Sequence, residues 1–232
     1  MKFSVLSIYK DFIDDYKKAG VIGRACTAGI IQIDSYDIRD YSSDRHKAVD
    51  DYPYGGGAGM VMTPQPVADC IKDVKGGRDI PVIFFTPRGR KFDSKTAKEY
   101  SQLDEVILLC GHFEGIDERA VQLYADDEIS MGDYIVTGGH ISAVCFIDST
   151  ARYVKGVLGN EFSSQDESFE NGLLEYEQYT RPAEFEGMTV PEVLMSGNHK
   201  LLSEYKEKRS LELTAQRRPD LYEEYLKKKD PQ

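Results

Sequence analysis

The sequence has no run of about 18 apolar residues, no cysteine pair at CxxC spacing and no excess of basic charge. A membrane-spanning helix is therefore not expected, and the opening MKFSVLSIYKD meets charge too early for a signal peptide. The four cysteines, Cys26, Cys70, Cys110 and Cys145, stand 35 or more residues apart in or beside apolar segments. Buried reduced thiols are expected, rather than a disulfide or metal site. These absences predict a cytoplasmic protein that does not enter a membrane.

The net charge of −11 argues against a non-specific nucleic-acid binder. The charge is uneven, however, because the segment from Lys200 onward has nine Lys or Arg and seven Asp or Glu. Only this tail is locally basic. A chain of 232 residues, 41% hydrophobic and 30% charged, is long enough for one large domain, or for one domain and a smaller one.

The centre of the chain predicts a ligand crevice between two glycine turns. Val106–Cys110 is a continuous apolar run that is typical of a strand buried on both faces, and it ends at Gly111. Asp133–Val136 is expected to be a second short strand before the glycine pair 138–139, with a helix over 140–153. Glycine turns at strand ends expose backbone N–H groups and allow close approach of a ligand. Plain turn chemistry is the alternative reading of the same glycines.

The order of the other elements predicts an α/β fold. Strands are expected at 3–8, 30–33 and 81–85, and helices at 11–19 with Gly20 as the C-cap, at 67–74 and at 94–102. This alternation indicates a mostly parallel sheet with helices on both faces. The polar segment 159–172 is the expected linker, between a domain of 1–158 and a small, mainly helical domain of 173–232.

The polar segment Asp40–Met60 contains two patterns that resemble binding motifs, a dinucleotide-binding loop and a metal cluster, and neither function is favoured. Its glycines spell GxGxG, but DDYPY precedes them where a dinucleotide-binding loop needs a buried strand. A nucleotide-dependent oxidoreductase is therefore not favoured. His46 lies near Asp44, Asp50 and Asp51 and could belong to a metal cluster, although a single histidine among loop carboxylates is more typical of a solvated or substrate-facing side chain. We predict no metal site.

Several longer strings resemble one family. DRHKAVDDYPYGGGAGM, CGHFEGIDER, GDYIVTGG, GVLGNE, YTRP and VLMSGNH are similar, in order and spacing, to the bacterial tRNA (guanine-N1)-methyltransferases, the TrmD family, over nearly the whole chain. The resemblance implies a knotted (SPOUT) methyltransferase fold with a trefoil knot at the C-terminal part of the sheet domain. It also implies a homodimer with the active site at the interface, S-adenosylmethionine (AdoMet) as methyl donor, and tRNA as substrate, methylated on N1 of guanosine 37 after another guanosine.

The resemblance assigns binding residues. Donor contacts fall on Phe84, Phe85, Thr86, Pro87, Gly111, Glu114, Met131, Gly132, Asp133, Tyr134, Ile135, Val136, Gly138 and Gly139. Apolar walls and backbone groups suit adenine, and a glutamate suits the hydroxyl groups or the cationic centre of the donor. Substrate contacts fall on His46, Asp50, Ser196, Asn198 and His199, and the basic tail adds Arg217 and Arg218 as candidates for phosphate contacts.

The chemistry of guanine N1 requires a base and a cation. N1 carries a proton that a carboxylate must remove, and the negative charge that develops on O6 needs a guanidinium. Arg152 occupies the family's arginine position, with a salt bridge to Asp148 as the alternative role. The family has an aspartate before the Ser-Phe pair of the linker, whereas this sequence has Glu167 there and Asp166 one residue earlier. Either is a candidate base, although a glutamate carboxylate reaches about 1.5 Å further.

Three further departures concern the donor loops. Arg88 stands where glutamine is typical, His140 where glutamate is usual, and Ser142 where proline or alanine is common. His140 is more typical of a helix N-terminal residue than of a catalytic one. With Glu167, these departures leave one alternative function, a tRNA-binding paralogue with weak or lost methyltransferase activity.

Overall fold

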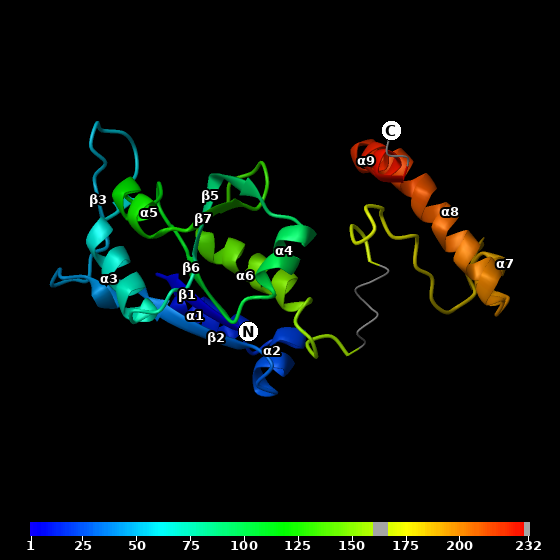
Figure 1. Cartoon of the computed structure of the whole chain (residues 1–232), viewed down its shortest axis with the longest axis horizontal. Coiled ribbons are helices and arrows are strands. Elements are labelled where there is room, and N and C mark those ends of the chain that lie inside the picture. Colours follow the sequence, from blue (N-terminus) through cyan, green and yellow to red (C-terminus); the bar gives the residue numbers. More distant parts are fainter. Residues whose placement is uncertain (160–166, 230–232) are drawn as a thin grey trace. The chain divides into compact units, whose positions relative to one another are not determined.

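A five-stranded sheet organises the N-terminal part of the chain (Figure 1). Its strands are β1 (Lys2–Ser7), β2 (Gln32–Asp37), β5 (Val82–Lys91), β6 (Glu105–Leu109) and β7 (Asp127–Ser130). Their order is β2-β1-β6-β5-β7, and every neighbouring pair is parallel. This confirms the predicted α/β fold with a mostly parallel sheet. The structure, a computed structural model, describes residues 1–159 and 167–229.

Helices cover both faces of the sheet because successive strand residues are apolar and point to opposite sides. In β6, Val106 and Leu108 join one buried cluster and Ile107 and Leu109 join another. The first cluster is covered by α1 (Lys10–Tyr16), α2 (Gly20–Thr27), α4 (Ser94–Tyr100) and α6 (Gly139–Ala151). The second is covered by the 3-10 helix η1 (Ile38–Tyr41), α3 (Pro64–Lys75) and α5 (Glu118–Tyr124).

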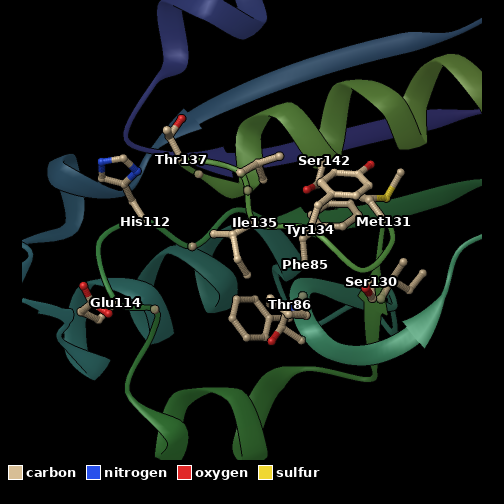
Figure 2. Close-up of a pocket in the computed structure, with 18 of the residues that line it drawn as sticks. Phe85, Thr86, His112, Glu114, Ser130, Met131, Tyr134, Ile135, Thr137 and Ser142 are labelled. Atoms are coloured by element: carbon tan, nitrogen blue, oxygen red, sulfur yellow. The ribbon is translucent and has the colours of Figure 1, made fainter.

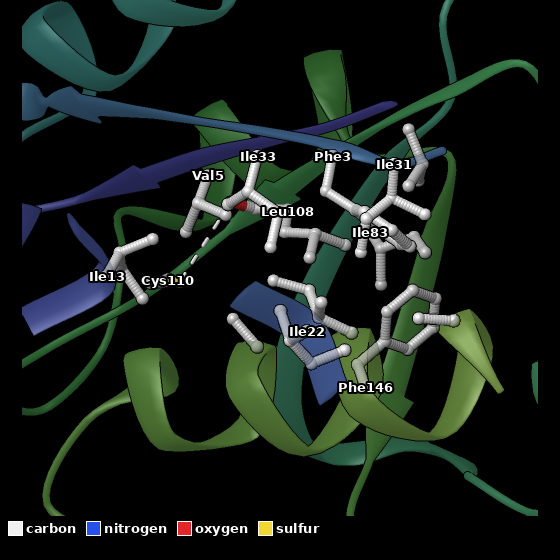
Figure 3. Packing of buried hydrophobic residues seen from close by; sticks show 14 of the residues in the cluster. Phe3, Val5, Ile13, Ile22, Ile31, Ile33, Ile83, Leu108, Cys110 and Phe146 are labelled. Carbon is white, nitrogen blue, oxygen red and sulfur yellow. Dashed lines mark hydrogen bonds between the residues drawn. The ribbon is translucent and has the colours of Figure 1, made fainter. Parts of the chain in front are cut away.

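The helix α6 is fixed to the sheet by the aromatic ring of Phe146. This side chain has no exposed surface, and its ring centroid lies 5.8 Å from that of Phe85, 5.1 Å from Phe92 and 5.2 Å from Tyr100. Figure 3 shows Phe146 facing the sheet residues Ile83 and Phe3. The packing holds the start of α6 beside the strand ends, which is where the site lies.

Local hydrogen bonds explain where two of the helices begin, α4 and α2. Asp93 caps α4 by accepting a hydrogen bond from the Thr96 N–H at 2.7 Å. Gly20, predicted as the C-cap of a helix over 11–19, is instead the first residue of α2, so that prediction was wrong. The first helix ends at Tyr16, and the Gly23 N–H bonds to the Ala19 carbonyl at 2.7 Å to begin a second helix.

The strand predicted at Asp133–Val136 was also wrong, because the last strand of the sheet is β7, a few residues earlier. Tyr134 and Ile135 are 60% and 80% exposed, so this apolar segment lies in a loop. The strand β7 begins with two acidic residues, which concealed it in the sequence. Within the fold, Asp127 is paired with Arg90 at 2.7 Å and accepts a hydrogen bond from Tyr100 at 2.6 Å. The charge is therefore satisfied at the edge of the sheet.

Contacts divide the chain into two units, Met1–Glu161 and Phe162–Gln232. Unit 1 also has the short strands β3 (Asp50–Asp51) and β4 (Val61–Met62), which pair antiparallel. Unit 2 contains the hairpin β8 (Glu184–Phe185) and β9 (Met188–Thr189) and the helices α7 (Glu192–Met195), α8 (His199–Arg217) and α9 (Pro219–Lys229). No helix among the residues described is both long and apolar enough to cross a bilayer.

Candidate active site

A cavity of about 380 Å³ lies at the carboxyl ends of β5, β6 and β7, beside the start of α6 (Figure 2). This is the place where parallel α/β sheets bind small molecules. Figure 2 shows His112 and Glu114 on one side of the cavity and Met131 and Tyr134 on the other. The loop after β7, which the sequence suggested was a strand, forms one wall.

The cavity brings together most residues that the resemblance assigns to the donor. Thirteen of the fourteen line it, namely Phe84, Phe85, Thr86, Pro87, Gly111, Glu114, Met131, Gly132, Tyr134, Ile135, Val136, Gly138 and Gly139. Asp133 is not among the lining residues. Ile129, Ser130 and Thr137 line the cavity although the sequence did not single them out. Ile129 and Ser130 were missed because β7 was not recognised as a strand.

Glycine makes room for the tight approach of the backbone at this site. A Cβ atom on Gly139 would lie 2.8 Å from the Cα of Cys110 and 2.9 Å from the Gly111 nitrogen. The Gly139 N–H in turn bonds to the Gly111 carbonyl at 2.8 Å, which holds the start of α6 against the end of β6. Gly132 has a left-handed φ of 140°, and a Cβ atom there would lie 2.7 Å from the Tyr134 ring. These positions require glycine for steric reasons.

Glu114 contacts the glycine-rich segment of unit 1 through both its backbone and its side chain. Its backbone N–H bonds to the Met60 carbonyl at 2.9 Å, and a Cβ atom on Gly59 would lie 2.5 Å from its Oε1 atom. The loop that follows β3 is therefore attached to the cavity wall at its C-terminal end. The arrangement leaves a carboxylate at the border between the cavity and this loop.

Two histidines lie on either side of Gly138. A Cβ atom there would be 2.8 Å from the Nδ1 atoms of both His112 and His140. Tyr9 joins them, with its hydroxyl 3.3 Å from the Nε2 atom of His112 and its ring centroid 4.6 Å from that of His140. Burial, and to a smaller extent the neighbouring His112, lowers the pKa of His140. The lowered pKa favours the uncharged imidazole of His140 beside Gly138.

Of the other departures from the family pattern, only Ser142 lines the cavity. Arg88 points elsewhere and pairs with Glu118 of α5 at 2.9 Å. That ion pair raises the pKa of the exposed Arg88 guanidinium and lowers the pKa of Glu118. The change from glutamine at position 88 thus adds a surface ion pair and places no charge in the cavity.

A sequence model of the family described as "tRNA (Guanine-1)-methyltransferase TrmD" matches residues 1–224. The chain belongs to this family. A relative from Clostridium perfringens, 53% identical over 99% of this chain and 97% of its own length, is named tRNA (guanine-N(1)-)-methyltransferase. Relatives from Lachnospira eligens, 49% identical over 98% of both chains, and Clostridioides difficile, 48% identical over 96% and 97%, have the same name. The TrmD resemblance seen in the sequence is confirmed, and the family is one of enzymes.

The catalytic candidates carried over from the TrmD family lie in both units. Arg152 is the C-cap residue of α6, at the end of the helix that begins at the cavity. Asp148, its alternative partner, accepts a hydrogen bond from the Tyr16 hydroxyl at 3.1 Å. Glu167 belongs to unit 2, where its carbonyl accepts a hydrogen bond from the Glu170 N–H at 3.4 Å. Asp166 lies outside the described residues.

The residues of unit 1 that were predicted to bind the substrate, His46 and Asp50, precede the glycine-rich segment of the loop. His46 is exposed in a turn that Asp44 closes by accepting a hydrogen bond from its N–H at 2.7 Å. Asp50 is half-buried and pairs with Met62 in the short β3–β4 ladder. Over residues 1–159 and 167–229, no three His, Cys, Asp or Glu side chains gather as a metal site. The carboxylate of Asp44 thus stabilises the turn at His46 through this hydrogen bond.

The residues of unit 2 that were predicted to bind the substrate lie at or beside the two ends of α8. Asn198 caps the helix by accepting hydrogen bonds from the N–H groups of Lys200 and Leu201 at 3.1 and 3.3 Å. Ser196 and His199 flank this cap and are exposed. Arg217 is the exposed last residue of α8, whereas Arg218 is paired with Asp220 at 2.5 Å, which lowers the pKa of that carboxyl to about 2.

Proposed function

We propose that this chain is a tRNA methyltransferase that transfers a methyl group from AdoMet to N1 of guanosine 37. The observation that carries the proposal is the glycine-lined cavity at the strand ends, in a chain that belongs to the TrmD family. Its volume of about 380 Å³ lies within the range of cavities that bind small ligands. The names of the relatives give the reaction and the substrate.

AdoMet fits the residues of this cavity. The adenine ring needs apolar walls, which buried Phe84, Phe85 and Ile129 supply, together with backbone groups exposed by the glycine turns. The ribose hydroxyls or the cationic sulfonium would be bound by the carboxylate of Glu114. When bound, AdoMet supplies an activated methyl group. We therefore assign the thirteen lining residues named above to the donor site, together with Asp133, whose place next to Gly132 permits a backbone contact.

The general base in this proposal is Glu167. Guanine N1 is a poor nucleophile while it is protonated, so the carboxylate must accept the proton from N1 as the methyl group is transferred. Two hydrogen bonds hold the backbone around it, because the Ser168 hydroxyl accepts from the Glu175 N–H at 2.9 Å and the Phe169 N–H donates to the Leu173 carbonyl at 2.8 Å. Leu173 is buried. An ordered backbone lets the longer glutamate side chain act in place of an aspartate, and Asp166 is the second candidate.

Arg152 stabilises the charge on the guanine base. As N1 loses its proton, negative charge moves to O6, where a guanidinium can donate one or two hydrogen bonds. The packed helix α6 gives Arg152 a fixed backbone position, because Phe146 and Ile147 of the same helix are fully buried. The cation is thus supplied by unit 1 and the base by the linker.

The domain assignment follows from these roles. Residues 1–158 are the knotted AdoMet-binding domain, 159–172 the linker with the base, and 173–232 the tRNA-binding domain. The trefoil knot is carried over from the TrmD resemblance. Phosphate contacts fall to Arg217 and Arg218, and Ser196, Asn198, His199, His46 and Asp50 position the tRNA.

The active form in this proposal is a homodimer, with the site completed by the partner subunit. Support comes from the resemblance and from exposed apolar side chains of unit 1, since Tyr9, Phe12 and Val21 are 40%, 43% and 38% exposed. Apolar patches of this kind mark interaction surfaces.

The test is single-turnover methyl transfer from labelled AdoMet to a tRNA transcript with guanosines at 36 and 37. Glu167→Gln removes the base without a large change in size, and Glu170→Gln on the same turn is the matched control. We expect Glu167→Gln to lose about 100-fold or more in rate while tRNA binding persists, because one general base contributes about 10²–10⁴-fold. Asp166→Asn is run in parallel to decide between the two carboxylates.

Two results would contradict the proposal. If wild type binds tRNA and AdoMet yet forms no N1-methylguanosine, the chain is a binding paralogue. If Glu167→Gln and Asp166→Asn both keep the wild-type rate, neither carboxylate is the base.

A further inference from the structure

Tyr52 and Tyr54 are the most exposed aromatic side chains that the structure describes. Their exposed fractions are 80% and 99%, compared with 40% for Tyr9 and 60% for Tyr134. At these exposed fractions the two rings contribute little to packing, although burial of a tyrosine normally stabilises a fold. Both lie in the loop between β3 and β4, which Figure 1 shows projecting beside α5.

The local backbone presents the rings outward. Pro53 separates the two tyrosines, fixes its own φ and favours an extended conformation for Tyr52. A hydrogen bond from the Gly56 N–H to the Pro53 carbonyl at 3.2 Å closes a turn, and Gly55 takes the left-handed φ of 88° that a type II turn needs at its third position. Tyr54 is at the second position, a corner of the turn, so its ring points away from the chain.

The loop is attached to the donor cavity. Its C-terminal end is held by the hydrogen bond from the Glu114 N–H to the Met60 carbonyl at 2.9 Å and by that from the Met62 N–H to the Gly115 carbonyl at 2.9 Å. Glu114 and Gly115 both line the cavity. The C-terminal end of the loop therefore lies at the rim of the proposed donor site.

Arg119 of α5 is the cation that interacts with the outer tyrosine. It pairs with Asp117 at 2.8 Å, and this pair, with a smaller contribution from Tyr54, raises the pKa of Arg119. A guanidinium next to an exposed ring matches a nucleotide, which has a flat base and an anionic phosphate.

We infer that Tyr52 and Tyr54 are a stacking platform for the unpaired tRNA bases that flank the methylated guanosine. The inference rests on the proposed function, since enzymes that modify a base inside an active-site pocket take that base out of the stack. The bases next to it then lose a stacking partner. Aromatic side chains stack on such bases in single-stranded RNA without regard to sequence.

The experiment measures tRNA binding, donor binding and base stacking separately. Tyr52→Ala, Tyr54→Ala and the double variant remove the rings, Tyr54→Phe keeps the ring without the hydroxyl, and Leu123→Ala removes an exposed apolar side chain of α5 as the matched control. Stacking of one base on one ring predicts an increase of about ten-fold in the Kd for tRNA for each tyrosine removed. Tyr54→Phe and Leu123→Ala should match wild type, and the Kd for AdoMet should stay constant throughout.

The second readout is the fluorescence of a tRNA with 2-aminopurine in the place of base 38. Stacking on a ring should quench it in the complex with wild type and Tyr54→Phe, and the quenching should be lost with the double alanine variant. Equal tRNA affinity and equal quenching in wild type and the double variant would overturn the inference. If wild type binds tRNA without methylating it, the proposed function fails, but a ring-dependent affinity would still support the platform.

Discussion

Replacement of Gly139 by alanine should separate the start of α6 from the end of β6. The added Cβ atom would lie 2.8 Å from the Cα of Cys110 and 2.9 Å from the Gly111 nitrogen, and these backbone atoms cannot rotate away. Overpacking of this kind costs about 1–3 kcal/mol, and the better helix propensity of alanine recovers about 1 kcal/mol at most. We expect a net loss of about 1–2 kcal/mol.

Two other glycines give graded controls. A Cβ atom on Gly138 would meet side-chain atoms of His112 and His140 at 2.8 Å, and these rings can turn, so Gly138→Ala should be less destabilising. A Cβ atom on Gly159 has no neighbour within 4 Å, so Gly159→Ala should match wild type. For a chain of this size, 1 kcal/mol changes the Tm by about 2–4 °C.

Calorimetry gives the Tm, and titration with AdoMet gives the Kd for the donor. The reasoning predicts the order Gly139→Ala, Gly138→Ala, Gly159→Ala from the largest loss of Tm to the smallest, with weaker donor binding in the first two. A Gly139→Ala protein with the Tm and Kd of Gly159→Ala would refute it, because the close backbone contact would then have no energetic consequence.

Three further predictions concern the core, acid stability and the tail. Phe146→Ala should lower the free energy of unfolding by about 3–5 kcal/mol in urea titrations, since the ring is fully buried among three other aromatic rings; a loss below 1 kcal/mol would be inconsistent with that packing. Burial alone would raise the pKa of Asp127, but the bonds from Arg90 and Tyr100 hold it below its ordinary value. The stability from this group is therefore complete above the unfolded pKa of about 4 and is lost as pH falls through the lower folded value. Asp127→Asn should flatten the decrease in Tm between pH 4 and pH 2 in scanning calorimetry, and an unchanged slope would contradict this. Arg217→Ala should reduce the salt slope of tRNA binding by about one, and Arg218→Ala by less, because Asp220 already neutralises Arg218; equal slopes in wild type and Arg217→Ala would remove this end of α8 from the tRNA surface.

Most elements of the sheet were predictable from short segments. The run Val106–Cys110 has no polar residue, so it identified β6, and the spacing of Val67, Ile71 and Val74 identified α3. The strand β7 was not predictable in this way, because its charge is satisfied only by Arg90 and Tyr100 in the fold. The exposed Tyr134 and Ile135 look like strand residues in the sequence and are loop residues in the structure.

The family strings in the sequence led to fourteen predicted donor contacts, and thirteen of these residues line one cavity in the structure. Ile129 and Ser130 were missed with β7. Two of the four cysteines, Cys70 and Cys110, are buried as expected, whereas Cys145 is exposed on α6 because the apolar spacing of that helix does not show which side meets the sheet.

The sequence by itself determined the α/β class, the family and the residues available for chemistry, because these depend on local apolar patterns and on motif identity. The tertiary structure decided which of those residues meet. Only the packing of α6 brings Gly139 within bonding distance of Gly111, and only the attachment of Met60 to Glu114 brings the exposed tyrosine loop to the rim of the cavity. Contacts between segments 28 and 54 residues apart arise from packing of the whole domain, which local sequence patterns do not encode.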